Sequence, residues 1–161
     1  MEHGAVEQLP GDELAKGLPA DRTAVVDELR DAALALIDAR HADLDGWAGA
    51  AAMLLADGSV VTSTAPEFLN GAVGLCHEVG ALCEAYKRGV GVRASACVVR
   101  ITGHGTRVLA PCGVCQERLR SYGDDVLVAV ADPGDPSRAV ARTLRQVQPY
   151  PWTDALPPDD L

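Results

Sequence analysis

The sequence has few aromatic residues and no long hydrophobic run. Phe, Trp and Tyr make up 4% of the 161 residues, whereas apolar residues together make up 48%, so we expect a core of small aliphatic side chains. No apolar stretch approaches the roughly 20 residues that a membrane helix needs. The first residues, 1–4, also lack the basic start and apolar centre of a signal peptide. These features predict a soluble cytoplasmic protein with one globular domain.

Basic residues are also in short supply. The 14 Lys and Arg residues are scattered among 23 Asp and Glu residues, and the net charge is −9. A protein that follows the phosphates of a long nucleic acid needs clustered Lys and Arg. The charge balance therefore disfavours a polynucleotide partner. A neutral or cationic small molecule fits this composition better.

The five cysteines argue against a disulfide framework, because their number is odd and the chain shows no export signal. Cys112 and Cys115 form a Cys-x-x-Cys pair at the expected start of a helix. Alone, this pair fits a redox site, part of a structural zinc site or chance. A third cysteine, Cys76, lies upstream and is followed two residues later by Glu78. The other two, Cys83 and Cys97, we interpret as small buried core residues.

Hydrophobic periodicity predicts the order helix, hairpin, helix, strand, helix, strand, helix. The expected helices cover about 22–40, 75–89, 112–121 and 137–145, and the expected strands cover about 47–55, 59–63, 92–101 and 126–131. Alternation of helices and strands after the hairpin implies crossover connections between parallel strands. We therefore expect an α/β protein, a three-layer α/β/α sandwich with a mixed, mostly five-stranded sheet.

The ends of the chain differ in composition from its middle. We expect a loose leader over 1–20, a folded domain over 21–147 and a tail over 148–161, in which 149–152 is too proline-rich for regular structure. The polar, glycine-containing segment 64–74 should form a loop just before the helix that carries Cys76. Because binding residues concentrate on loops, this loop is a candidate for substrate contacts.

The three cysteines and Glu78 fit a metal-dependent hydrolysis. Each cysteine is expected in the first turn of a helix, where the partial positive charge of the helix N-terminus favours thiolate. Zinc with three protein ligands keeps one open position and can lower the pKa of water from about 15.7 to about 7. Glu78 is placed to transfer protons. His77 is a conceivable fourth ligand, but it directly follows Cys76, so its side chain should point elsewhere.

These motifs resemble the cytidine deaminase superfamily, in particular the small three-cysteine branch that includes cytidine deaminase and blasticidin-S deaminase. The resemblance covers about 47–144. The family's Cys-Ala-Glu appears at 76–78, and its Pro-Cys-Gly-x-Cys-Arg-Gln-x-Leu appears at 111–119. Its Gly-Ala-Ala-Leu-Leu strand resembles 50–54.

The resemblance implies an enzyme with Zn²⁺ as cofactor. The metal ligands would be Cys76, Cys112 and Cys115, and Glu78 would be the catalytic residue. The reaction would be hydrolytic deamination of an aminopyrimidine nucleoside, with release of ammonia. A homotetramer would be the assembly, with neighbouring subunits closing each site.

The positions at which the sequence departs from the family pattern matter most for the identity of the substrate. Trp47 resembles the family's aromatic residue near the base, and Glu67 matches the Glu of its ribose-binding Asn-x-Glu. Ala65, however, stands where the Asn is expected, and Gln116 replaces the Arg that neutralises the thiolates. We expect a cytidine-like or blasticidin-S-like substrate. The alternatives are another small aminoheterocycle, or a non-catalytic zinc-stabilised binding domain of the same fold.

Overall fold

The computed structural model describes residues 21–43 and 45–157. The leader expected over 1–20 lies outside the described residues. The elements in chain order are α2 (Arg22–His41), β1 (Trp47–Leu55), β2 (Val60–Ser63), the 3-10 turn η1 (Gly71–Val73), α3 (Val79–Arg88), β3 (Val92–Ile101), β4 (Gly105–Leu109), α4 (Gly113–Arg120), β5 (Leu127–Ala131), β6 (Ala139–Thr143), α5 (Leu144–Val147) and the 3-10 turn η2 (Trp152–Ala155). None of the helices in this part of the chain is long and apolar enough to cross a membrane.

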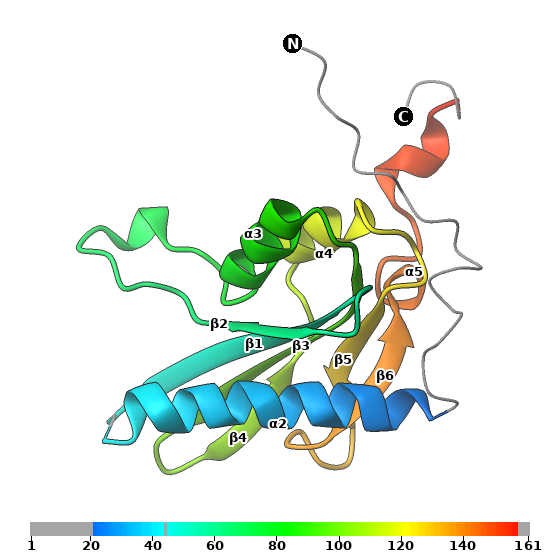
Figure 1. Cartoon of the computed structure of the whole chain (residues 1–161). Coiled ribbons are helices and arrows are strands. Elements are labelled where there is room, and N and C mark those ends of the chain that lie inside the picture. Colours follow the sequence, from blue (N-terminus) through cyan, green and yellow to red (C-terminus); the bar gives the residue numbers. More distant parts are fainter. Residues whose placement is uncertain (1–20, 44, 158–161) are drawn as a thin grey trace.

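The structure is an α/β fold with a mixed sheet between two helical layers, as the sequence predicts. Five strands follow the order β2-β1-β3-β5-β6, and β4 pairs with the remaining part of β3. β3 and β5 run parallel, whereas β1–β2, β1–β3, β3–β4 and β5–β6 are antiparallel. Figure 1 shows α2 on one face of the sheet and α3 and α4 on the other.

In the part of the chain that the structure describes, the sheet has six strands rather than the five expected, and the predicted helix starting at Ser137 is wrong. Residues 105–109 fold back onto β3 after a tight turn in which Gly103 and Gly105 have positive φ angles of 76° and 73°. Residues 139–143 pair with β5, so only 144–147 are helical. A capping box starts α5 at Thr143 rather than at Ser137.

Alternation along the strands divides the core into two layers. The even-numbered residues of β1, Ala48, Ala50 and Ala52, face α2, and their small side chains let its buried Leu29 and Ile37 pack closely. The odd-numbered residues Met53 and Leu55 face the other way, into a cluster with α3 and α4. Successive side chains of a strand point to opposite faces, so one strand serves both layers.

The helix expected over 75–89 begins later than predicted. α3 starts at Val79 with Glu78 as its N-cap residue, and the backbone before it makes a turn in which the Cys76 carbonyl accepts from the Val79 N–H at 3.1 Å. Cys76 therefore precedes the helix instead of lying in its first turn. The expected ends of α2 and α4 lie within one residue of the observed ones.

The C-terminal segment contains more structure than its prolines suggest. Residues 152–155 form η2, so the expectation of no regular structure over 149–152 is wrong at Trp152. Pro151 stands at the N-cap of η2, where its missing N–H costs no hydrogen bond.

Candidate active site

The structure brings together the three cysteines that the sequence singles out. The sulfurs of Cys76, Cys112 and Cys115 all lie within 4.8 Å of one another, and the Sγ atoms of Cys76 and Cys112 are 3.3 Å apart. Three thiolates at about 2.3 Å from a tetrahedral zinc would stand roughly 3.8 Å from each other. The spacing and softness of these donors therefore fit a zinc ion.

The N-terminal end of α4 supplies two of the sulfurs. Cys112 is its N-cap residue, and Cys115 lies in its first turn. Cys76 comes from the turn before α3, so the three sulfurs belong to two segments separated in sequence by α3, β3 and β4. The unpaired N–H groups at a helix N-terminus stabilise negative charge, which favours thiolate at Cys112.

The thiols differ in how their surroundings affect ionisation. Burial, with a further contribution from the negative charge of Glu78, raises the pKa of Cys115 far above its usual range. Burial and the thiol of Cys112 likewise raise the pKa of Cys76. For Cys112, burial is outweighed by hydrogen bonds from the Cys115 N–H, the Cys76 thiol and other groups, so its pKa is lowered. Three thiolates this close need a cation to balance their charge.

Glu78 is a buried acidic residue two positions after Cys76, at the start of α3. Its residue is only 4% exposed, and its carbonyl begins α3 by accepting from the Leu82 N–H at 3.0 Å. The side chain makes no capping hydrogen bond to α3. Its negative charge contributes, after burial, to the raised pKa values of Cys76 and Cys115.

His77 points away from the sulfurs. Its Nδ1 accepts a hydrogen bond from the Ala65 N–H at 3.1 Å, and its ring lies against Gly49. Among the described residues, the group of candidate metal ligands contains only the three cysteines. Burial, and to a smaller extent the nearby His41, lower the pKa of His77, while the charge of Glu78 opposes them. His77 is thus a neighbour of the metal-ligand cluster rather than a member.

The two candidate substrate residues occupy different places. Glu67 is exposed and lines a cavity of about 540 Å³ together with Arg40, His41 and the 64–66 segment of the loop. Trp47 begins β1, is 69% exposed and is not part of that lining. Because residues two apart on a strand share a face, Trp47 lies on the same side of the sheet as Gly49, the side of His77.

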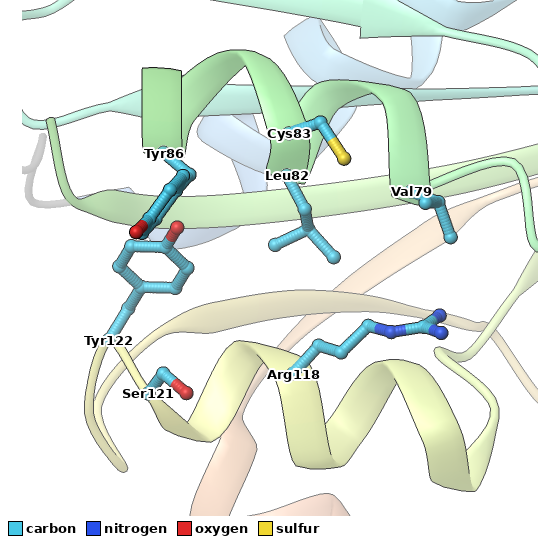
Figure 2. Close-up of a pocket in the computed structure, with 7 residues that line it drawn as sticks. All are labelled: Val79, Leu82, Cys83, Tyr86, Arg118, Ser121 and Tyr122. Atoms are coloured by element: carbon cyan, nitrogen blue, oxygen red, sulfur yellow. The ribbon is translucent and has the colours of Figure 1, made fainter. Parts of the chain in front are cut away.

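A second cavity, of about 400 Å³, lies between α3 and α4. Figure 2 shows its lining residues, with Leu82, Cys83 and Tyr86 coming from α3 and Arg118 from α4. Neither the three clustered sulfurs nor Glu78 contributes to this lining. These four residues are also absent from the lining of the 540 Å³ cavity, so the sulfur cluster and Glu78 lie outside both cavities. Of the remaining thiols, Cys97 is buried as expected, whereas Cys83 is exposed, so its interpretation as a buried core residue is wrong.

Gln116 supports the start of α4 rather than the sulfurs. Its Nε2 donates to the Pro111 carbonyl at 2.8 Å. The next residue, Glu117, accepts a hydrogen bond from Trp152 Nε1 at 2.9 Å and another from Gln148, which joins the C-terminal segment to α4. These hydrogen bonds lower the pKa of Glu117 below its usual value.

Sequence reasoning missed two sets of contacts. A lone glycine inside a strand often marks a close approach by another group, so Gly49 was an available signal for the His77 contact. The bond between Glu117 and Trp152 joins residues 35 positions apart, and no local pattern announces it.

Comparison with known proteins agrees with the motifs. No protein-family model matches the chain. The chain is similar to the crystal structure of cytidine deaminase from Bacillus anthracis, with 39% identity over 81% of this chain and 91% of that chain and a TM-score of 0.75. It also resembles the structure of cytidine deaminase from Mycobacterium tuberculosis, with 30% identity over 78% of this chain and 95% of that chain and a TM-score of 0.58.

The curated sequence of cytidine deaminase from Mycobacterium tuberculosis strain H37Rv is 39% identical over 83 residues, or 51% of this chain. The match spans 59% of that relative's length. The identity and coverage of the Bacillus anthracis structure, together with the shared fold, identify the protein at the level of its family: the chain belongs to the cytidine deaminases.

Proposed function

We propose that the protein is a zinc-dependent hydrolase that deaminates an aminopyrimidine nucleoside or nucleoside analogue and releases ammonia. The observation that carries this proposal is the cluster of Cys76, Cys112 and Cys115 with the buried Glu78 beside it. Membership of the cytidine deaminase family supports deamination as the reaction. Cytidine-like and blasticidin-S-like molecules are the substrates we propose.

The donor set supports zinc as the cofactor. Cys76, Cys112 and Cys115 would hold the ion, and three sulfur ligands leave one of the four positions of a tetrahedral zinc open, as in catalytic sites. When bound, zinc supplies a Lewis acid that makes water nucleophilic near neutral pH. His77 does not compete for the open position, because its Nδ1 accepts from the Ala65 N–H and its Nε2 lies against Gly49.

Glu78 is the proposed catalytic residue. Its carboxylate can accept a proton from the attacking water and deliver it to the ring nitrogen beside the reacting carbon. It can then accept the remaining proton of the added hydroxyl group and pass it to the amine, which leaves as ammonia. Because Glu78 is only 4% exposed, few solvent molecules can compete with the substrate for its carboxylate. Its side chain is also not used to cap α3. Proton transfer by a positioned group of this kind typically contributes 10²- to 10⁴-fold to a rate.

We place the substrate's sugar or its equivalent near Glu67 and the base on the side of Trp47. Glu67 lines the 540 Å³ cavity beside the end of α2, and this volume falls within the range of small-molecule sites. Ala65, in the position where the family pattern has Asn, offers no side-chain hydrogen bond. Recognition of the sugar must therefore differ from the family pattern, which leaves nucleoside analogues and other small aminoheterocycles as candidate substrates.

A homotetramer in the cytoplasm is the proposed assembly and location, with residues 21–147 as the deaminase domain and 148–161 as its tail. Exposed apolar side chains support association between subunits. Those on the loop and the turn before α3 are Phe68, Leu69, Val73 and Leu75, and Tyr86 lies at the cavity between α3 and α4. The acid excess supports a small-molecule substrate over a long nucleic acid.

The direct test is to measure ammonia release from cytidine, deoxycytidine, cytosine, blasticidin S and other aminoheterocycles, with zinc content determined alongside. Glu78→Gln should keep zinc and lower kcat by about 10²- to 10⁴-fold, because the amide cannot transfer protons. Parental turnover by this variant would contradict the mechanism. Zinc binding without ammonia from any compound would instead favour the non-catalytic binding domain.

A further inference from the structure

The loop that carries Glu67 is attached to the segment that carries the metal ligands, and His77 makes the attachment. Ala65 donates its backbone N–H to His77 Nδ1 at 3.1 Å. His77 stands between Cys76 and Glu78, so this one bond links the loop directly to the proposed metal and catalytic residues. Pro66 has no N–H, so Ala65 supplies the only backbone donor of this dipeptide.

The absence of a side chain at Gly49 leaves room for the imidazole ring of His77. A Cβ atom added to Gly49 would lie 2.1 Å from His77 Nε2 and under 3 Å from two ring carbons, so no other residue type fits at this position of β1 without displacing the imidazole. Gly49 also accepts a hydrogen bond at its carbonyl from Thr64 Oγ1 at 2.6 Å. Gly49 therefore contacts the His77 ring and also holds Thr64, the first residue of the loop.

A further contact fixes the backbone of His77 itself. Ser63 Oγ donates to the His77 carbonyl at 2.5 Å, and a Cβ at Gly80 would meet Ser63 Cβ at 2.8 Å, so the turn before α3 is seated closely on β2. With its backbone held and one ring face against β1, the imidazole has a fixed orientation. Its Nδ1 is then a rigid acceptor for the loop.

We infer that His77 is a positioning residue that sets the backbone of 64–67 at the sugar side of the substrate cavity, and so helps to select the substrate. This inference rests on the proposed function for the identity of the substrate. Thr64, Ala65 and Glu67 all line the 540 Å³ cavity, so a shift of this backbone moves the cavity wall and the Glu67 carboxylate together. His77 acts through the loop and touches neither the metal nor the reacting atoms.

Two variants separate the hydrogen bond from the bulk of the ring. His77→Asn keeps an acceptor oxygen near the position of Nδ1 but removes the ring, whereas His77→Leu keeps bulk and removes the acceptor. For His77→Leu we expect KM for cytidine to rise about 3- to 10-fold, with kcat within about twofold of the parent, because the lost contact is one uncharged hydrogen bond. His77→Asn should recover most of the parental KM. The inhibition constant of cytosine, which has no sugar, should change in neither variant.

Hydrogen exchange of the Ala65 amide, followed by NMR, tests the anchor without any turnover. The amide should be protected in the parent and in His77→Asn and should exchange at least about tenfold faster in His77→Leu, since an amide without a partner exchanges more freely. Equal exchange in all three proteins, or an inhibition constant for cytosine that rises as much as KM for cytidine, would overturn the inference. If the parent deaminates nothing, the proposed function fails, while the exchange experiment still decides the anchor.

Zinc content in each variant is the control for damage to the metal-ligand cluster. We expect the parental zinc content in His77→Asn and His77→Leu. Loss of zinc in both would make His77 part of the metal site and contradict the assignment. Gly49→Ala provides an independent route to the same result, because its Cβ displaces the ring and should raise KM for cytidine as His77→Leu does.

Discussion

The two faces of the sheet use the same strands for different purposes. On one face, α2 packs a continuous apolar stripe, including Val26, Leu29 and Ile37, against the small alanines of β1 and β3. On the other face, α3 and α4 also bury apolar residues (Figure 1), but the N-terminal end of α4 places Cys112 beside Cys76, and Glu78 stands at the N-cap of α3. The α2 face therefore provides stability, and the α3–α4 face provides stability and carries the proposed chemistry.

The largest expected effect comes from removing a proposed metal ligand. Cys115→Ser should lose zinc and all ammonia release. The substitution removes one of the three thiolates, and a buried serine hydroxyl does not replace a thiolate as a zinc ligand. The loss of zinc affinity should exceed the 10- to 100-fold typical of residues that only support ligands. Zinc content after dialysis, measured by atomic emission, checks this result.

Cys83→Ser is the matched control, because Cys83 lies on the same face, on α3, but outside the sulfur cluster. Its zinc content should equal that of the parent. Equal zinc loss in the two variants would show that the cluster is not the metal site.

A substitution on the α2 face should lower the stability of the fold and leave zinc binding and activity unchanged. Leu29→Ala removes a side chain that is 2% exposed in the α2 layer and should lower the free energy of unfolding by about 2–5 kcal/mol. At a temperature where the variant remains folded, its zinc content and kcat/KM should be unchanged, since Leu29 touches none of the site. Urea unfolding gives the first quantity, and a loss of kcat/KM in the folded variant would contradict the division between faces.

Part of this division can be predicted from sequence because it depends on local periodicity. The apolar spacing of Val25, Leu29 and Ile37 predicts α2, and the Asp57-Gly58 turn predicts the β1–β2 hairpin, in which the Gly58 φ angle is 83°. The cysteine spacing in the Cys-x-x-Cys motif depends on only one helical turn. Patterns of this kind are formed by neighbours in the chain and need no knowledge of the rest of the fold.

The features that the sequence did not reveal depend on distant partners. Ser137 has the residue type of a helix cap, but pairing with β5 makes 139–143 a strand. The contact between His77 and Gly49, and the hydrogen bond from Ser63 Oγ to the His77 carbonyl in the turn before α3, join segments that are separated in sequence. Their geometry is set by how α3 is seated on β1 and β2, which no local window contains.

The smallest expected effect concerns the C-terminal segment joined to α4. Trp152→Phe keeps an aromatic ring and removes the Nε1 donor to Glu117, an exposed hydrogen bond. The melting temperature should fall by on the order of 1 °C, and zinc content should not change. A large loss of zinc in this variant would extend the functional region from the N-terminal end of α4 to the tail.

The central claim is that three sulfurs hold one zinc with an open position beside Glu78. X-ray absorption at the zinc edge of the purified parent protein tests it most directly. We predict one zinc per chain with three sulfur neighbours at about 2.3 Å and a single oxygen neighbour at about 2.0–2.2 Å. A fourth sulfur, a histidine nitrogen in place of the oxygen, or a protein that binds no zinc would contradict the account.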